Sequence, residues 1–144
     1  MYSYMNRFQD LGLLLLRLGF GTMYVIHGYP KLQAGTAMWE QLGMAMGNLG
    51  ITFAPVFWGF MAMLAEFLGG ILLALGFFAR PACLFMAFTM LVATVMHLTK
   101  GDGFLVASHA IENGIVLFSL IFIGPGRYSV DAFRARPSAS DGGQ

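Results

Sequence analysis

Four long apolar stretches run through the chain, separated by polar segments that contain glycine or proline. They cover about residues 11–29, 53–79, 82–98 and 106–124. A helix needs roughly 17–25 mostly apolar residues to cross the hydrocarbon core of a bilayer, and each stretch has a suitable length. The stretches are continuously apolar rather than alternating, which argues against membrane-spanning strands. The sequence therefore predicts an all-α integral membrane protein with four transmembrane helices in an antiparallel bundle.

The shorter connections fit a bundle of helical hairpins. ARPA at 79–82 predicts a tight turn, and TKGDGF at 99–104 predicts a short polar loop. GPGRYSVD at 124–131 ends the last helix with glycine and proline. We expect residues 1–131 to form a single membrane domain and residues 132–144 to form a flexible cytoplasmic tail.

The longest connection, residues 30–52, carries a pattern of its own. Trp39 is the kind of residue that lies at a membrane–water interface. Around it, apolar residues recur at helical spacing: Met38, Leu42, Ala45, Met46 and Leu49. The pattern predicts a short interfacial helix over the mouth of the bundle, between the first and second transmembrane helices. A plain polar loop is the alternative.

The composition agrees with a membrane protein, since 58% of the residues are apolar, 10% are charged and the mean hydropathy is +0.71. Water-soluble domains carry about 25% charged residues. A net charge of +1 provides no basic surface, so we expect the lipid bilayer and not nucleic acid as a partner. A single cysteine, Cys83, excludes an internal disulfide or a thiolate metal cluster. With no haem, flavin or iron–sulfur signature, we expect no covalently bound cofactor and no complete redox enzyme in this chain alone.

Basic residues predict the orientation of the bundle, because lysine and arginine gather on the cytoplasmic side. One side carries five of them: Arg7, Arg80, Arg127, Arg134 and Arg136. The other side carries Lys31 and Lys100. Both termini are therefore predicted to be cytoplasmic.

Three charged side chains fall inside the predicted spans: Arg17, Glu66 and Glu112. A charge that faces lipid at the bilayer centre costs about 2.5–3.5 kcal/mol, so all three are predicted to face the bundle interior. Glycines at helical steps from Arg17 and Glu66, such as Gly21 and Gly70, predict close helix contacts on these faces. We expect Glu66 to be the first partner of Arg17, with Glu112 the second.

This network makes Glu112, Glu66 and Arg17 the candidate catalytic residues. One arginine against two glutamates leaves a carboxylate without a cation, which favours a protonatable site at Glu112 beside His109. The alternative is a purely structural network that fixes the helix register.

The three histidines fall near the predicted outward ends of their helices. Together with Lys31, they are the candidate cofactor-binding residues: His27, His97 and His109. His109 and Glu112 have the spacing His-x-x-Glu once, whereas di-iron bundles use Glu-x-x-His twice with further glutamates. We therefore predict hydrogen-bonded histidines at a polar helix end and no metal site.

Several segments, in order, resemble the DoxX family of small bacterial membrane proteins. They are LLRLGFGTMYVIHGYPKL (15–32), AEFLGGILLALGFFARPACL (65–84), VMHLTKGDGF (95–104), IENGIVLF (111–118) and GPGRYSVD (124–131). The resemblance implies a four-helix protein of the bacterial inner membrane. It places the polar positions of the family on Arg17, His27, Gly28, Lys31, Glu66, Gly69, Gly70, Arg80, His97, Glu112 and Asp131.

The resemblance implies two classes of function. In the first, the chain is a membrane subunit of a quinone-linked or oxidative-stress-related oxidoreductase complex in sulfur or thiol metabolism. Quinone is then the candidate cofactor, and oxidoreductase subunits are the partners. In the second, the chain is a non-catalytic assembly, cargo or small-solute transport factor. Its buried charges are then structural, or its interior binds a small hydrophobic ligand.

Overall fold

The computed structural model describes residues 2–135 and contains no strand in that range. The elements are α1 (Tyr2–Gly43), the 3-10 helix η1 (Met44–Leu49), α2 (Pro55–Leu75), α3 (Ala79–Lys100), α4 (Phe104–Ile123) and α5 (Val130–Arg134). α1 to α4 are each long and apolar enough to cross a membrane. The predicted four-helix membrane fold is therefore confirmed.

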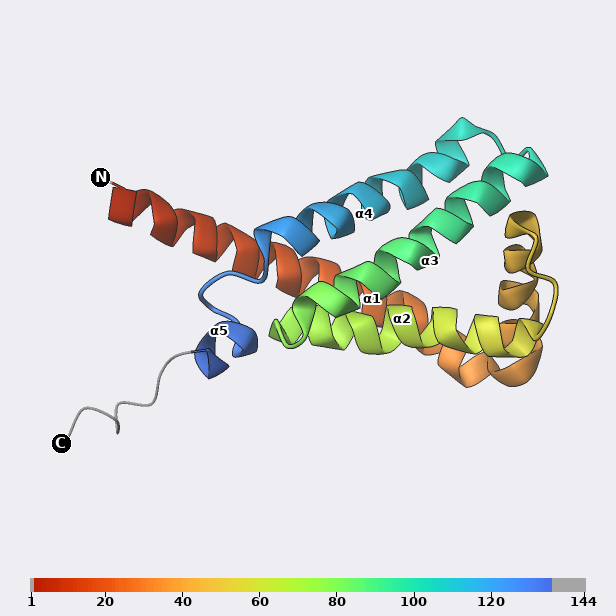
Figure 1. The fold of residues 1–144 in the computed structure, drawn as a ribbon, viewed down its shortest axis with the longest axis horizontal. Helices are drawn as coiled ribbons and strands as arrows, with labels where there is room; N and C mark the ends of the chain where they lie inside the picture. Colours follow the sequence, from red (N-terminus) through yellow and green to blue (C-terminus); the bar gives the residue numbers. More distant parts are fainter. Residues whose placement is uncertain (1, 136–144) are drawn as a thin grey trace.

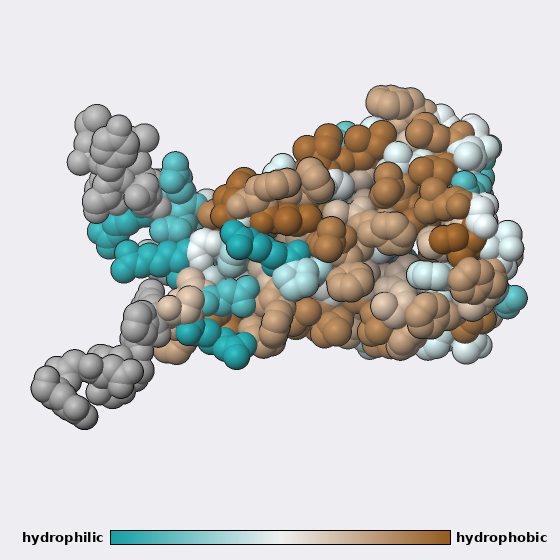
Figure 2. All heavy atoms as spheres, in the orientation of Figure 1, coloured by the Kyte–Doolittle hydropathy of each residue, from teal (hydrophilic) through white to brown (hydrophobic). Residues whose placement is uncertain are grey.

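The helices pack as two pairs. α1 lies along α2, and α3 lies along α4, with α3 also contacting α2 (Figure 1). The start of α1 and the short α5 lie at the same end of the bundle. Figure 2 shows apolar side chains over most of the visible face and polar side chains gathered at that end. This distribution suits a surface whose middle faces lipid.

Glycines set the close packing of α1 on α2. A Cβ on Gly21 of α1 would lie 2.5 Å from the carbonyl oxygen of Gly70 on α2. That separation is too short for a carbon and an oxygen, so only glycine allows this approach. The predicted contact between these two faces is confirmed.

The first helix is longer than the sequence predicts, because it does not end at Pro30. Proline lacks an N–H, yet α1 continues through it and turns at Gly35, which has φ 71°. This left-handed conformation favours glycine. The indole Nε1 of Trp39 then donates to the carbonyl of Lys31 at 2.9 Å, which satisfies an acceptor near the kink. Lys31 therefore lies inside the helical part of α1.

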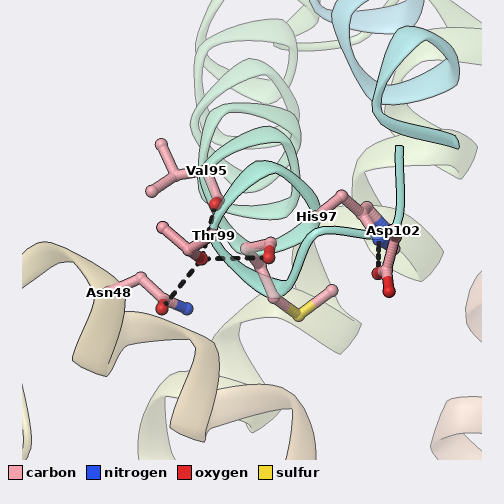
Figure 3. Close-up of polar contacts among 6 residues, drawn as sticks. Asn48, Val95, His97, Thr99 and Asp102 are labelled. Carbon is pink, nitrogen blue, oxygen red and sulfur yellow. Dashed lines mark hydrogen bonds and ion pairs between the residues drawn. The ribbon is translucent and has the colours of Figure 1, made fainter. Parts of the chain in front are cut away.

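After Gly35, residues 36–43 and η1 form the predicted helical segment rather than a plain loop. This segment lies across the ends of α2 and α3 (Figure 1). Ala45 and Met46 are buried, whereas Met38 and Leu49 at the two ends of the stripe are exposed. The Thr99 hydroxyl of α3 donates to the Asn48 side chain at 3.0 Å, which ties η1 to α3 (Figure 3).

The segment after α4 folds back onto the turn between α2 and α3. The carboxylate of Asp131 accepts from the backbone nitrogens of Phe78 and Ala79, at 2.9 and 3.1 Å. Asp131 thereby satisfies free N–H groups at the start of α3. The predicted tail, 132–144, begins inside the unpredicted α5, and residues 136–144 lie outside the described part of the chain.

Candidate functional site

A partly buried ion pair joins α1 to α2. The Lys31 ammonium donates to Oε2 of Glu66, whose side chain is only 7% exposed. The helices approach closely here because Gly28, one turn before Lys31, has no side chain. A Cβ at this glycine would lie 2.6 Å from the backbone nitrogen of Phe67. An unpaired charge is costly within a bilayer, so each member of the pair compensates the other.

Two open cavities meet at this ion pair. The first, of about 450 Å³, lies between α1, η1, α2 and α3. The second, of about 530 Å³, lies mainly between α1, α3 and α4, with Glu66 of α2 in its wall. Lys31, Glu66, Ala93 and His97 line both cavities. The ion pair and His97 therefore form part of a shared wall.

The remaining walls of the two cavities differ in chemistry. Large apolar side chains and one indole surround the first cavity, among them Met46, Trp58, Met61, Phe85 and Phe88. Polar side chains contribute to the second: Tyr24, His27, His109 and Asn113. The first cavity suits an apolar molecule with a polar end at the ion pair. The second suits water or a small polar solute.

A hydrogen bond to Asp102 orients His97 at the shared wall. Its Nδ1 lies 2.8 Å from Oδ2 of Asp102, in the loop between α3 and α4 (Figure 3). A carboxylate on one ring nitrogen fixes the ring and its tautomer. The other ring nitrogen, Nε2, is then available to a ligand. Among residues 2–135, no group of three or more histidine, cysteine, aspartate or glutamate side chains is arranged to hold a metal ion.

Comparison with known proteins matches this architecture to a family. The model of the DoxX family matches residues 12–99, which include Lys31, Glu66 and His97. The chain belongs to the DoxX family. It is 31% identical over 132 residues to the inner membrane protein YqjF of Escherichia coli (strain K12), an alignment that covers 88% of this chain and 95% of that relative. No solved structure matches the chain.

In this DoxX-family chain, the four candidate cofactor-binding residues lie around one cavity. His27, Lys31, His97 and His109 come from three different helices, and all of them line the second cavity. Glu66, a candidate catalytic residue, joins them there. The arrangement brings these residues together, and their role in binding stays a prediction.

The predicted ion pair between Arg17 and Glu66 is wrong. Arg17 is 1% exposed, and its Nη2 donates to the backbone carbonyl of Tyr128 at 2.6 Å. It lies 14 residues before Lys31, about 21 Å along the axis of α1, so Lys31 reaches Glu66 instead. The carbonyl acceptor comes from the segment that folds back after α4. Arg17 therefore holds the end of the bundle and lines neither cavity.

The prediction that Glu112 faces the interior is also wrong. Glu112 is exposed and lines neither cavity. The side of α4 that packs inward carries small and apolar residues: Ala107, Ala110, Leu117 and Leu120. Glu112 lies on the opposite side of the helix. α4 packs mainly against α3, so its polar stripe is not enclosed by the other helices.

Two residues of the cavities have unsatisfied donors that the sequence did not single out as site residues. Trp58 lines the first cavity, and its indole Nε1 is buried with no hydrogen-bond partner among the described residues. Tyr24 lines the second cavity, and its hydroxyl is likewise buried without a partner among these residues. Tyr24 shares a helix face with Gly21 and Gly28, which is a weak sequence signal. Trp58 lies in an apolar stretch of the sequence, which indicates an ordinary packing residue.

Proposed function

We propose that this DoxX-family chain is a multi-pass inner-membrane protein that binds a quinone and serves as a membrane subunit of an oxidoreductase complex. The observation that carries the proposal is the first cavity. Its walls are apolar, its volume is about 450 Å³, and it ends at Lys31, Glu66 and His97. Small-molecule sites commonly measure about 300–1,000 Å³ and combine apolar walls with a few placed polar groups.

The residues at the end of this cavity match the polar part of a quinone. Its carbonyl oxygens accept hydrogen bonds, and the Lys31 ammonium has three N–H groups, of which one is given to Glu66. His97, held by Asp102, offers a second polar contact. Glu66 fixes the position of the ammonium, and the aromatic walls receive the ring and the apolar tail. When bound, a quinone supplies a couple of two electrons and two protons.

The electrons in this proposal come from a partner protein with its own redox centre. Cys83 is buried and is the single cysteine of the sequence, so it cannot alternate between dithiol and disulfide within the chain. The role of this chain is to bind and orient the quinone. The inner-membrane location is supported by the relative YqjF, and the count of basic residues supports cytoplasmic termini.

Quenching of tryptophan fluorescence tests the proposal, because Trp58 lines the first cavity. We expect saturable quenching when ubiquinone-1 is added to the full chain in nanodiscs. A hydrogen bond to a charged group contributes about 1.5–3 kcal/mol, so loss of the Lys31 donor should weaken binding about tenfold or more. The double variant Lys31→Met with Glu66→Gln removes that donor without leaving a lone buried charge.

Lys100→Met is the matched control, since Lys100 is exposed and lines neither cavity. It should bind like the unchanged chain. Equal affinity in the control and in the double variant would overturn the site. Quenching that does not saturate with the unchanged chain would overturn quinone binding itself.

A further inference from the structure

The second cavity has polar side chains in its lining, although the helices around it are long and apolar enough to cross a membrane. Titratable side chains line it from every helix of the bundle: His27 and Lys31 on α1, Glu66 on α2, His97 on α3 and His109 on α4. The first cavity shares only Lys31, Glu66 and His97 from this set. The two cavities therefore offer very different surroundings to the same ion pair.

The polar side chains of the second cavity indicate what fills it. His27, His109 and Asn113 line it together with the Lys31–Glu66 ion pair. A polar group that finds no partner costs several kcal/mol in hydrocarbon, so polar groups within a membrane protein find partners in protein or in water. A volume of about 530 Å³ with several polar groups is large enough to hold many water molecules.

The position of the cavity connects it to an aqueous surface. The hairpin of α3 and α4 spreads away from α1 toward the α3–α4 loop (Figure 1). The residues that line the cavity come mostly from these three helices. At that end, His97 is hydrogen-bonded to Asp102, whose side chain is 39% exposed (Figure 3). Because His97 lines the same cavity as Lys31 and Glu66, polar side chains lie along the cavity from the exposed loop to the ion pair.

We propose that the second cavity is a water-filled vestibule that opens Glu66 to the aqueous phase on the side of the α3–α4 loop. One side of the ion pair is then wet, while the other faces the apolar cavity. The proposal deepens the proposed function, because a quinone site needs a path for protons, and water in the vestibule provides it. The vestibule itself requires only water access and stands without any quinone.

Labelling of engineered cysteines tests water access. In a Cys83→Ala background, Ala110→Cys places a thiol on the second cavity, and Ala65→Cys places one on the first. We expect an anionic, membrane-impermeant methanethiosulfonate to label Ala110→Cys in the folded chain and to leave Ala65→Cys unlabelled. Total thiol is counted after unfolding in detergent. A dry second cavity would leave both thiols unlabelled until unfolding, and that result would overturn the proposal.

The route to the ion pair is tested at Glu66 itself. Glu66→Cys in the same background should be labelled by the anionic reagent, which the Lys31 ammonium attracts. Adding Ala110→Phe, which fills the second cavity, should abolish this labelling. Ala65→Phe, which fills the first cavity, should not. Labelling that is blocked by Ala65→Phe alone would place the aqueous route through the apolar cavity and overturn the proposal.

A failure of the quinone site is distinguishable from a failure of the vestibule. Labelling uses no quinone, and fluorescence quenching uses no added thiol. If quenching is saturable but the thiols stay unlabelled, the quinone site is supported and the vestibule is contradicted. If the thiols are labelled but quenching does not saturate, the vestibule is supported and the quinone site is contradicted.

Discussion

Glu66 of α2 is paired with Lys31 of α1, and the pair lies on the wall that two cavities share. One cavity is apolar and suits the body of a membrane-soluble molecule, while the other is lined by histidines. A buried ion pair adds little stability by itself. Its position between two different cavities favours a role in binding over a purely structural one.

The ion pair makes a clear prediction about stability. Lys31→Met alone leaves the Glu66 carboxylate without its cation and should lower the free energy of unfolding by about 1–3 kcal/mol, less than for a dry pair because the open second cavity reaches Glu66. Adding Glu66→Gln removes the lone charge and should recover most of that loss. Unfolding of the purified variants in denaturing detergent measures both changes. A double variant as unstable as Lys31→Met would show that the two side chains do not compensate each other.

Arg17 should act on the fold and not on ligand binding. Arg17→Leu removes the hydrogen bond to Tyr128 and should cost about 1.5–3 kcal/mol. Combined with Glu66→Gln, its effect should be additive within about 0.5 kcal/mol, because the two residues share no contact. Unfolding of the single and double variants provides the measurement. A coupling well above that limit would restore the Arg17–Glu66 interaction expected from the sequence.

The α1–α2 interface predicts opposite effects for two neighbouring glycines. Gly21→Ala brings a Cβ within 2.5 Å of the Gly70 carbonyl oxygen, so it should push the helices apart and cost about 1–3 kcal/mol or more. Gly19→Ala meets nothing within 4 Å and should stabilise α1 by up to about 1 kcal/mol. Thermal unfolding in detergent compares them. Equal effects at both positions would contradict this packing.

Orientation is tested by reporter fusions. The five basic residues on one side against two on the other predict a cytoplasmic signal from a fusion after Gln144 and an exterior signal from one at Asn48. The two reporters, one active in the cytoplasm and one active outside it, control for each other. An exterior signal after Gln144 would reverse the orientation and place the opening of the vestibule on the cytoplasmic side.

The four spans were predictable because long apolar runs leave few alternatives for a chain of this composition. The partner of Glu66 was not predictable, since proline usually marks a helix boundary and the sequence therefore predicts a first span that ends at Tyr29, before Pro30. In the structure α1 continues to Gly35, which puts Lys31 beside Glu66.

The failure at Glu112 has a different cause. Periodicity shows which residues share a helix face, but it does not tell which face another helix covers. α4 packs with its alanines and leucines and leaves Glu112 exposed. The hydrogen bonds from the backbone of Phe78 and Ala79 to Asp131 are likewise long-range contacts that no local sequence pattern predicts.

The quinone site is tested most directly by photolabelling with an azido-quinone, followed by mass spectrometry of the labelled peptides. We predict that the label falls on residues lining the first cavity, such as Met61, Phe85 and Phe88, and that excess ubiquinone-1 competes it away. The label should also disappear in the double variant Lys31→Met with Glu66→Gln. A label spread over the exposed apolar surface, unchanged by the competitor and by the double variant, would contradict the account.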